Sequence, residues 1–118
     1  MNGLDLSISL QVGEEFAPSH PIDFWYSLLH KLPLLIGLTP LDPPIIHVFP
    51  SAQVATEIGV TGVIVMIQSH IAFHWWSETN FFHLTISSCQ GFNVEVVVKF
   101  LRNIFPVRWI KEGVSWWK

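Results

Sequence analysis

The tightest constraint on the fold is an alternation of apolar and polar residues near the start of the chain. Apolar residues stand at the even positions from Leu4 to Val12, and polar residues from Asp5 to Gln11 stand between them. A period of two residues is that of a β-strand with one buried and one solvent-facing side. The segment therefore predicts a strand whose dry face must be covered by the rest of the chain.

Two later segments have helical spacing instead. Apolar residues recur at helical intervals from Pro21 to Leu32, and Pro33 is expected to end or kink that helix. A second helix is expected to start at the capping residue Asn93 and to stop at Pro106. Further strands are expected at 45–49, 62–68, 71–76, 81–88 and 107–111, with a loop at 51–59.

The order of these elements is strand, helix, four strands, helix, strand. Two amphipathic helices can cover one face of a mostly antiparallel sheet, which predicts an α+β two-layer sandwich. No repeat or linker divides the chain, so residues 1–118 are expected to form one domain. The other face of the sheet also carries apolar side chains. We expect a second copy to cover it, in an αββα dimer.

The composition supports the dimer and excludes some partners. Only 13% of the residues are charged, against about 25% in average soluble domains. Aromatic residues are enriched at interfaces, and we take Trp109, Trp116 and Trp117 as candidates for one; a poorly soluble monomer is the alternative. Six Lys plus Arg against nine Asp plus Glu make nucleic acid an unexpected partner.

Membrane insertion and secretion are not expected. The apolar runs fall short of the roughly 20 residues that a membrane span needs, and the first residues lack the pattern of a signal peptide. The single cysteine, Cys89, cannot form an internal disulfide, which favours a cytoplasmic location.

Six polar residues cluster around the most apolar strands and need partners or a function: Gln68, Ser69, His70, His74, Glu78 and Cys89. Structural alternatives stay open: residues 68–70 as a turn, His74 as a satisfied core histidine, and Cys89 as a small buried hydrophobe. The i,i+4 spacing of His70 and His74 suits a metal only on a helix. No metal site is expected, because they lie in strand context without an obvious third ligand.

Taken together, these residues form a spaced pattern. Residues 59–78 read GVTGVIVMIQSHIAFHWWSE, and the interval from Ser69 is five residues to His74 and twenty to Cys89. This pattern resembles the prokaryotic S-adenosylmethionine decarboxylases, which have Gly-x-Ser-Gly, Glu-Ser-His, Ile-His-Thr-Trp-Pro-Glu and Thr-Cys-Gly at the same spacing. The resemblance covers residues 59–105, and a weaker one extends to the amino terminus. Upstream of residue 59, residues 47–50 look like the family's His-x-Phe-x-Pro.

The resemblance implies a pyruvoyl group made by self-cleavage between residues 68 and 69. The Ser69 hydroxyl would attack the Gln68 carbonyl, with His74 as the matching base. Thr61 stands where the family has an assisting serine. The pyruvoyl carbonyl, generated from Ser69, would form a Schiff base with the substrate amine and act as an electron sink. Cys89 would then supply the proton.

The resemblance also implies a substrate pocket and a dimer. Glu78 matches a pocket position that can bind ribose hydroxyls, and Phe49 and Trp76 are candidates for contacts with adenine or a sulfonium. The substrate would be S-adenosylmethionine, for spermidine synthesis, and the family's dimers have active sites near the subunit boundary.

Several departures from the family pattern mark a divergent member. Gln68 replaces a glutamate, residues 75–77 replace Thr-Trp-Pro, and Ser88 replaces a threonine. Two alternatives remain open. One is a pyruvoyl decarboxylase of another amino acid, such as arginine or ornithine. The other is a non-catalytic dimeric homologue that only binds a ligand or partner.

Overall fold

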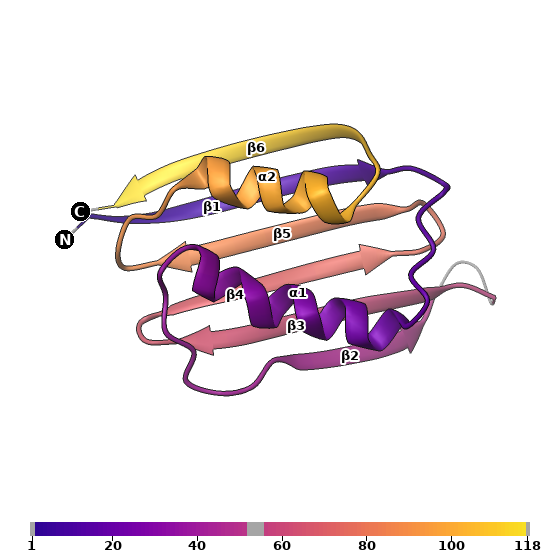
Figure 1. Cartoon of the computed structure of the whole chain (residues 1–118), viewed down its shortest axis with the longest axis horizontal. Coiled ribbons are helices and arrows are strands. Elements are labelled where there is room, and N and C mark those ends of the chain that lie inside the picture. The colour runs from indigo at the N-terminus through magenta and orange to yellow at the C-terminus, as the bar shows by residue number, and fades with distance from the viewer. Residues whose placement is uncertain (1, 52–55, 118) are drawn as a thin grey trace.

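The chain folds into one antiparallel sheet with two helices on one of its faces (Figure 1). A computed structural model describes residues 2–51 and 56–117. The sheet has six strands in the order β2-β3-β4-β5-β1-β6, and every neighbouring pair is antiparallel. The predicted α+β two-layer sandwich is confirmed.

The elements follow the predicted order. Their bounds are β1 Gly3–Val12, α1 Pro21–Leu35, β2 Ile45–Pro50, β3 Ile58–Met66, β4 Ser69–Trp76, β5 Phe81–Ser88, α2 Val94–Ile104 and β6 Val107–Trp117. The side chain of Asn93 caps α2 by accepting a hydrogen bond from the Glu95 N–H at 3.0 Å.

The core lies between the helices and the sheet. The alternating apolar residues of β1 are buried there, and so are those of β4 and β5. Trp25 of α1 stands at the centre, with its ring stacked on Phe73 at 5.1 Å and on Phe82 at 5.9 Å between ring centroids. Because this aromatic cluster holds α1 against the middle strands, it also fixes the faces that β4 and β5 present.

Several predicted ends of elements are wrong. Helix α1 does not end at Pro33, the first of the two outcomes expected there, but continues to Leu35, since a proline in the last turn removes only one helical N–H donor. Strand β6 runs to Trp117 and does not stop at residue 111, because its full length pairs with β1. Strand β3 begins at Ile58, inside the expected loop 51–59, of which residues 52–55 lie outside the described part.

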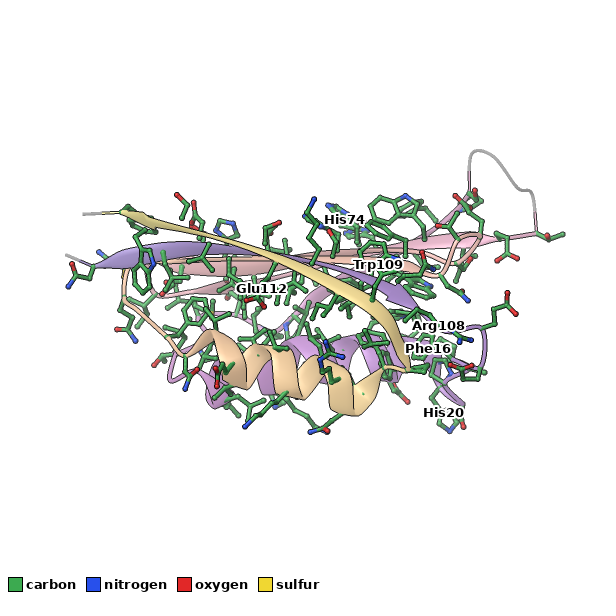
Figure 2. All side chains as sticks on the ribbon, turned by 90° about the horizontal axis from the view of Figure 1, so that it is seen from above. Phe16, His20, His74, Arg108, Trp109 and Glu112 are labelled. Atoms are coloured by element: carbon green, nitrogen blue, oxygen red, sulfur yellow. The ribbon has the colours of Figure 1, made fainter. Side chains whose placement is uncertain are left out.

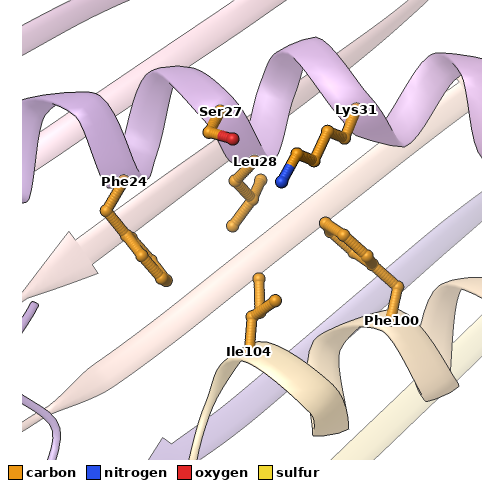
Figure 3. Close-up of a pocket in the computed structure, with 6 residues that line it drawn as sticks. All are labelled: Phe24, Ser27, Leu28, Lys31, Phe100 and Ile104. Carbon is orange, nitrogen blue, oxygen red and sulfur yellow. The ribbon is translucent and has the colours of Figure 1, made fainter.

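A small gap separates the two helices on their side of the sheet. Phe24 and Leu28 of α1 face Ile104 and Phe100 of α2 across a hollow of about 90 Å³, with Lys31 at its rim (Figure 3). None of the predicted site residues borders this gap. No helix within the described residues is long and apolar enough to cross a membrane.

The opposite face of the sheet, called the open face below, carries no helix (Figure 2). Several aromatic side chains are exposed there, including Phe49, Trp76 and Trp109. The three terminal tryptophans predicted for an interface are all exposed. They do not share one face, because Trp116 pairs opposite the buried Leu4, whereas Trp109 pairs opposite Gln11.

Candidate functional site

The hairpin between β3 and β4 brings the predicted serine and cysteine together. Ser69 begins β4 on the buried side, 8% exposed, and pairs with Ser88 at the end of β5. Its hydroxyl donates to the Ser88 hydroxyl at 3.3 Å and accepts from the Cys89 N–H at 3.4 Å. Ser69 and Cys89 are twenty residues apart in the sequence, and they meet because β4 and β5 are neighbouring strands.

Gln68 gives this hairpin a strained backbone. Ile67 and Gln68 form the two-residue turn, because Met66 pairs directly with Ser69. The φ angle of Gln68 is 53°, in the left-handed region that costs a residue other than glycine about 1 kcal/mol. Residues 68–70 are thus not all turn, as one structural alternative had it, since Ser69 and His70 belong to β4.

The predicted base and its assistant meet elsewhere. Thr61 of β3 lies opposite His74 of β4, and the Thr61 hydroxyl is 3.0 Å from the His74 Nδ1. Both lie on the open face, and Figure 2 shows His74 on the side of the sheet away from the helices. The interpretation of His74 as a core histidine is wrong, because its side chain is exposed.

Ser69 and His74 are not brought together within the chain. They lie on opposite faces of β4, and five residues of strand separate them by roughly 16 Å. A base must come within about 3 Å of the proton that it removes, directly or through one water. His74 therefore cannot serve Ser69 of its own chain in this arrangement.

A second histidine stands beside His74. His83 of β5 is its cross-strand partner, and the His83 Nδ1 is 2.9 Å from the hydroxyl of Ser9 on β1. Burial lowers the pKa of His83 from its usual 6.5, and the nearby His74 lowers it further. Sequence reasoning missed His83 and Ser9, because their place beside His74 depends on the strand register.

The predicted pocket residues lie at the end of β4 away from Ser69. Glu78 is in the turn after β4, and its Oε2 is buried without a hydrogen-bond partner among the described residues. Trp76 contacts Phe81, with 5.6 Å between ring centroids. Phe49 lies over Gly59, where a Cβ would come within 2.4 Å of its ring.

Phe49 and Trp76 therefore expose aromatic rings at one end of the open face, and the turn at the same end of β4 holds the buried Glu78 oxygen. A buried acceptor without a donor suits a ligand hydroxyl. Phe81 continues this row of rings toward Trp109, 6.1 Å away between centroids, and was not predicted as a site residue.

His70 and His74 are too far apart in the strand to share a metal ion. His70 and His74 lie on one face of β4, where four residues separate them by roughly 13 Å. No group of three or more His, Cys, Asp or Glu side chains suited to a metal occurs among the described residues.

The fold and the hairpin cluster define an α+β protein in which a buried serine follows a strained turn and contacts the backbone of a cysteine. Residues 22–113 match the family model of S-adenosylmethionine decarboxylase. The match spans well over half of the 118 residues, so the chain belongs to the S-adenosylmethionine decarboxylase family. No curated protein matches the chain.

Proposed function

We propose that this protein is a pyruvoyl-dependent S-adenosylmethionine decarboxylase, a divergent member of the prokaryotic branch. Family membership supports decarboxylation of S-adenosylmethionine in general. The observation that carries the finer proposal is the contact of Ser69 with Ser88 and the Cys89 backbone beside the strained Gln68. The product would supply aminopropyl groups for spermidine.

The first reaction would be cleavage of the chain by its own residues. The Ser69 hydroxyl attacks the carbonyl carbon of Gln68, and the amide becomes an ester as the Ser69 nitrogen leaves. A base then takes the α-proton of Ser69, and β-elimination releases the Gln68 carboxylate. Water then displaces the nitrogen that remains on residue 69, and this nitrogen departs as ammonia. The product is a pyruvoyl group at residue 69.

The left-handed φ of Gln68 favours this reaction, because cleavage releases the turn. A non-glycine residue held in this region persists only where the surrounding structure enforces it. Here the enforcing elements are β3 and β4, which pair up to Met66 and Ser69. Gln68 needs to offer only its carbonyl, so its replacement of the family's glutamate is compatible with cleavage.

A homodimer would supply the missing base. Within one chain His74 is roughly 16 Å from Ser69 along β4, so we place His74 of the partner subunit at the Ser69 hairpin, where it would take the α-proton from the backbone of Ser69 and not a proton from the inward-facing hydroxyl. The Thr61 hydroxyl would orient this imidazole through its 3.0 Å contact with Nδ1. The exposed aromatic rings of the open face are suited to the interface.

The residues around Ser69 fit a pyruvoyl group. The Ser88 hydroxyl and the Cys89 N–H already contact the Ser69 oxygen, and either can hold a carbonyl or carboxylate oxygen. When formed, the group supplies a carbonyl that draws electrons from the substrate. The half-buried Cys89 thiol would carry the proton for the product. The partner subunit's Glu78, Phe49 and Trp76 would bind the nucleoside, because the same residues of the chain that carries Ser69 lie at the far end of β4.

A second candidate function is decarboxylation of a basic amino acid such as arginine or ornithine. The observation that favours it is the carboxylate of Asp5, which lines a hollow on the open face and lies opposite Ser87 of β5. An acidic side chain there suits a substrate with a positively charged tail.

The mass of the purified chain tests the proposal. The wild type is expected to yield two fragments, residues 1–68 and 69–118, the second starting with pyruvoyl, while S69A stays at 13.5 kDa. Decarboxylation of S-adenosylmethionine, arginine and ornithine then separates the two candidate functions. A wild-type chain that stays uncut after long incubation would instead support the non-catalytic homologue.

A further inference from the structure

Four of the six histidines of the chain lie on the open face of the sheet: His47, His70, His74 and His83. His74 of β4 pairs with His83 of β5. On its other side His74 pairs with Thr61, and Thr61 pairs with His47 of β2. Residues paired across antiparallel strands share a face, and His70 shares the face of His74 within β4. Imidazoles therefore gather on the one side of the sheet that no helix covers.

The open face carries few other charged groups. Among its described residues there is one acid, Asp5 of β1, and one base, Lys111 of β6. Glu112 of β6 points to the helix side, because it pairs with a buried residue of β1. Arg108, at the irregularity of β6, forms an ion pair with Glu15. When the histidines are neutral, the face thus holds one charge of each sign and no net charge.

Acid changes the charge of this face. The usual pKa of histidine is about 6.5, so an exposed imidazole is mostly neutral at pH 7.5 and mostly charged at pH 5.5. His83 gains its proton last, because burial and the nearby His74 lower its pKa. Glu57 and Glu78 lie beyond the strands at one end of the sheet. They cannot neutralise a row of imidazolium groups that crosses from β2 to β5.

A second copy of the chain is the occupant that suits this face. Within one chain the predicted base His74 is roughly 16 Å from Ser69, so the site is incomplete without another copy. A face without net charge does not repel its own copy, and exposed rings such as Trp76 and Trp109 are suited to an interface. In a two-fold pairing of open faces, each histidine enters the interface twice.

We propose that protonation of the open-face histidines separates the two copies, so that the chain pairs at neutral pH and comes apart in acid. This control rests on the dimer of the proposed function and adds a proton-sensitive step to it. Burial in the interface lowers the pKa of a histidine. The free chain therefore binds more protons than the pair does, and a falling pH favours the free chain.

The size of the effect follows from the usual pKa. Each histidine that has to stay neutral in the interface weakens pairing by up to about tenfold between pH 7.5 and pH 5.5. One position in the sequence counts twice in a dimer, and so contributes up to about a hundredfold. Several positions act together, so the dissociation constant of the wild-type dimer is expected to rise by at least about a hundredfold over this interval.

Sedimentation equilibrium of the full-length chain at the two pH values measures this rise. A double variant with H47Q and H70Q removes two open-face histidines that have no role in the proposed catalysis, and its rise should be at least about tenfold smaller. A double variant with H20Q and H30Q is the matched control. His20 precedes α1 and His30 lies within it, both exposed, and Figure 2 shows His20 on the helix side. This control should behave as the wild type does.

The outcomes separate this inference from the proposed function. An equal dissociation constant at both pH values, an equal rise in the wild type and the H47Q and H70Q variant, or a monomer at pH 7.5 would each overturn the inference, whether or not the chain cleaves itself. Pairing that depends on these histidines in a chain that never cleaves would support the inference and refute the pyruvoyl enzyme. Both double variants keep His74 and His83, so a loss of fold in acid would affect them alike and cannot imitate the expected difference.

Discussion

Two variants that each fail to cleave alone are expected to cleave when they are produced together. S69A lacks the nucleophile, and H74A lacks the base. The structure puts Ser69 and His74 on opposite faces of β4, roughly 16 Å apart, whereas proton transfer needs about 3 Å. If the partner subunit provides the base, a mixed dimer contains one complete pair: Ser69 of the H74A chain and His74 of the S69A chain.

The size of the effect follows from random pairing. About half of the dimers from equal co-expression are mixed, so about half of the H74A chains, or a quarter of all chains, should be cut. Intact mass spectrometry reads this fraction directly, because residues 69–118 then appear as a separate fragment. A mass tag on the S69A chain shows which variant was cut. H74A alone should stall at the ester, which hydroxylamine can still cut.

Two results would refute this reasoning. If H74A were cut on its own at the wild-type rate, His74 would not be the base. If the mixture stayed uncut while light scattering showed dimers, and the wild type cleaved under the same conditions, the base would come from the same chain. The hairpin would then have to differ from the arrangement described here.

Three further predictions concern single residues. C89A should still cleave but release far less correctly protonated product, measured as product formed for each CO2 released; unchanged turnover would reduce Cys89 to a packing residue. The pKa of His83 is lower in the folded chain than its usual 6.5. Below about pH 6.5 the unfolded state therefore binds more protons than the folded state, and the free energy of unfolding should fall as the pH drops. H83Q should show a smaller fall in urea titrations at several pH values, and an identical fall would contradict the lowered pKa. W25A should lose about 3–5 kcal/mol in urea unfolding, because Trp25 is 2% exposed among aromatic rings; a loss below about 1 kcal/mol would mean that the cluster repacks.

Periodicity predicted the fold because each strand has one buried face and each helix one apolar stripe. It could not predict where β6 ends. Residues 112 and 113 are Glu and Gly, which interrupt the apolar pattern, yet pairing with β1 continues until Trp117 lies opposite Gly3. Hydrogen bonds to a neighbouring strand fix such an end, and that neighbour is far away in sequence.

The candidate site shows the same limit. The spacing of Ser69 and Cys89 was informative because a hairpin and a strand of fixed length place Ser69 opposite Ser88. The interval of five residues from Ser69 to His74 places the two side chains on opposite faces only if both belong to one strand. The strand was expected to begin at residue 71, so the sequence did not predict this separation. The resemblance supplied two chemical roles without saying that they belong to different faces of the sheet.

This separation restricts how two copies can pair if the proposed dimer is right. When two open faces pack together, a two-fold axis along the strands would set each Ser69 end against the Ser69 end of the partner. An axis across the strands exchanges the ends, and sets each Ser69 hairpin against the end that bears Trp76 and Glu78. Only the second pairing can join the two groups of site residues.

The two pairings differ in a distance that can be measured. Ile67 lies in the hairpin turn and is 55% exposed, so spin labels on I67C in a C89S chain report the separation of the two hairpins. The axis across the strands predicts a separation of about 26 Å or more, the length of an eight-residue strand, because the hairpins lie at opposite ends of the dimer. The axis along the strands allows a separation near the spacing of packed sheets, about 10 Å. A short distance would exclude a base donated by the partner subunit, because each hairpin would then face its own copy and His74 would lie beyond the reach of both.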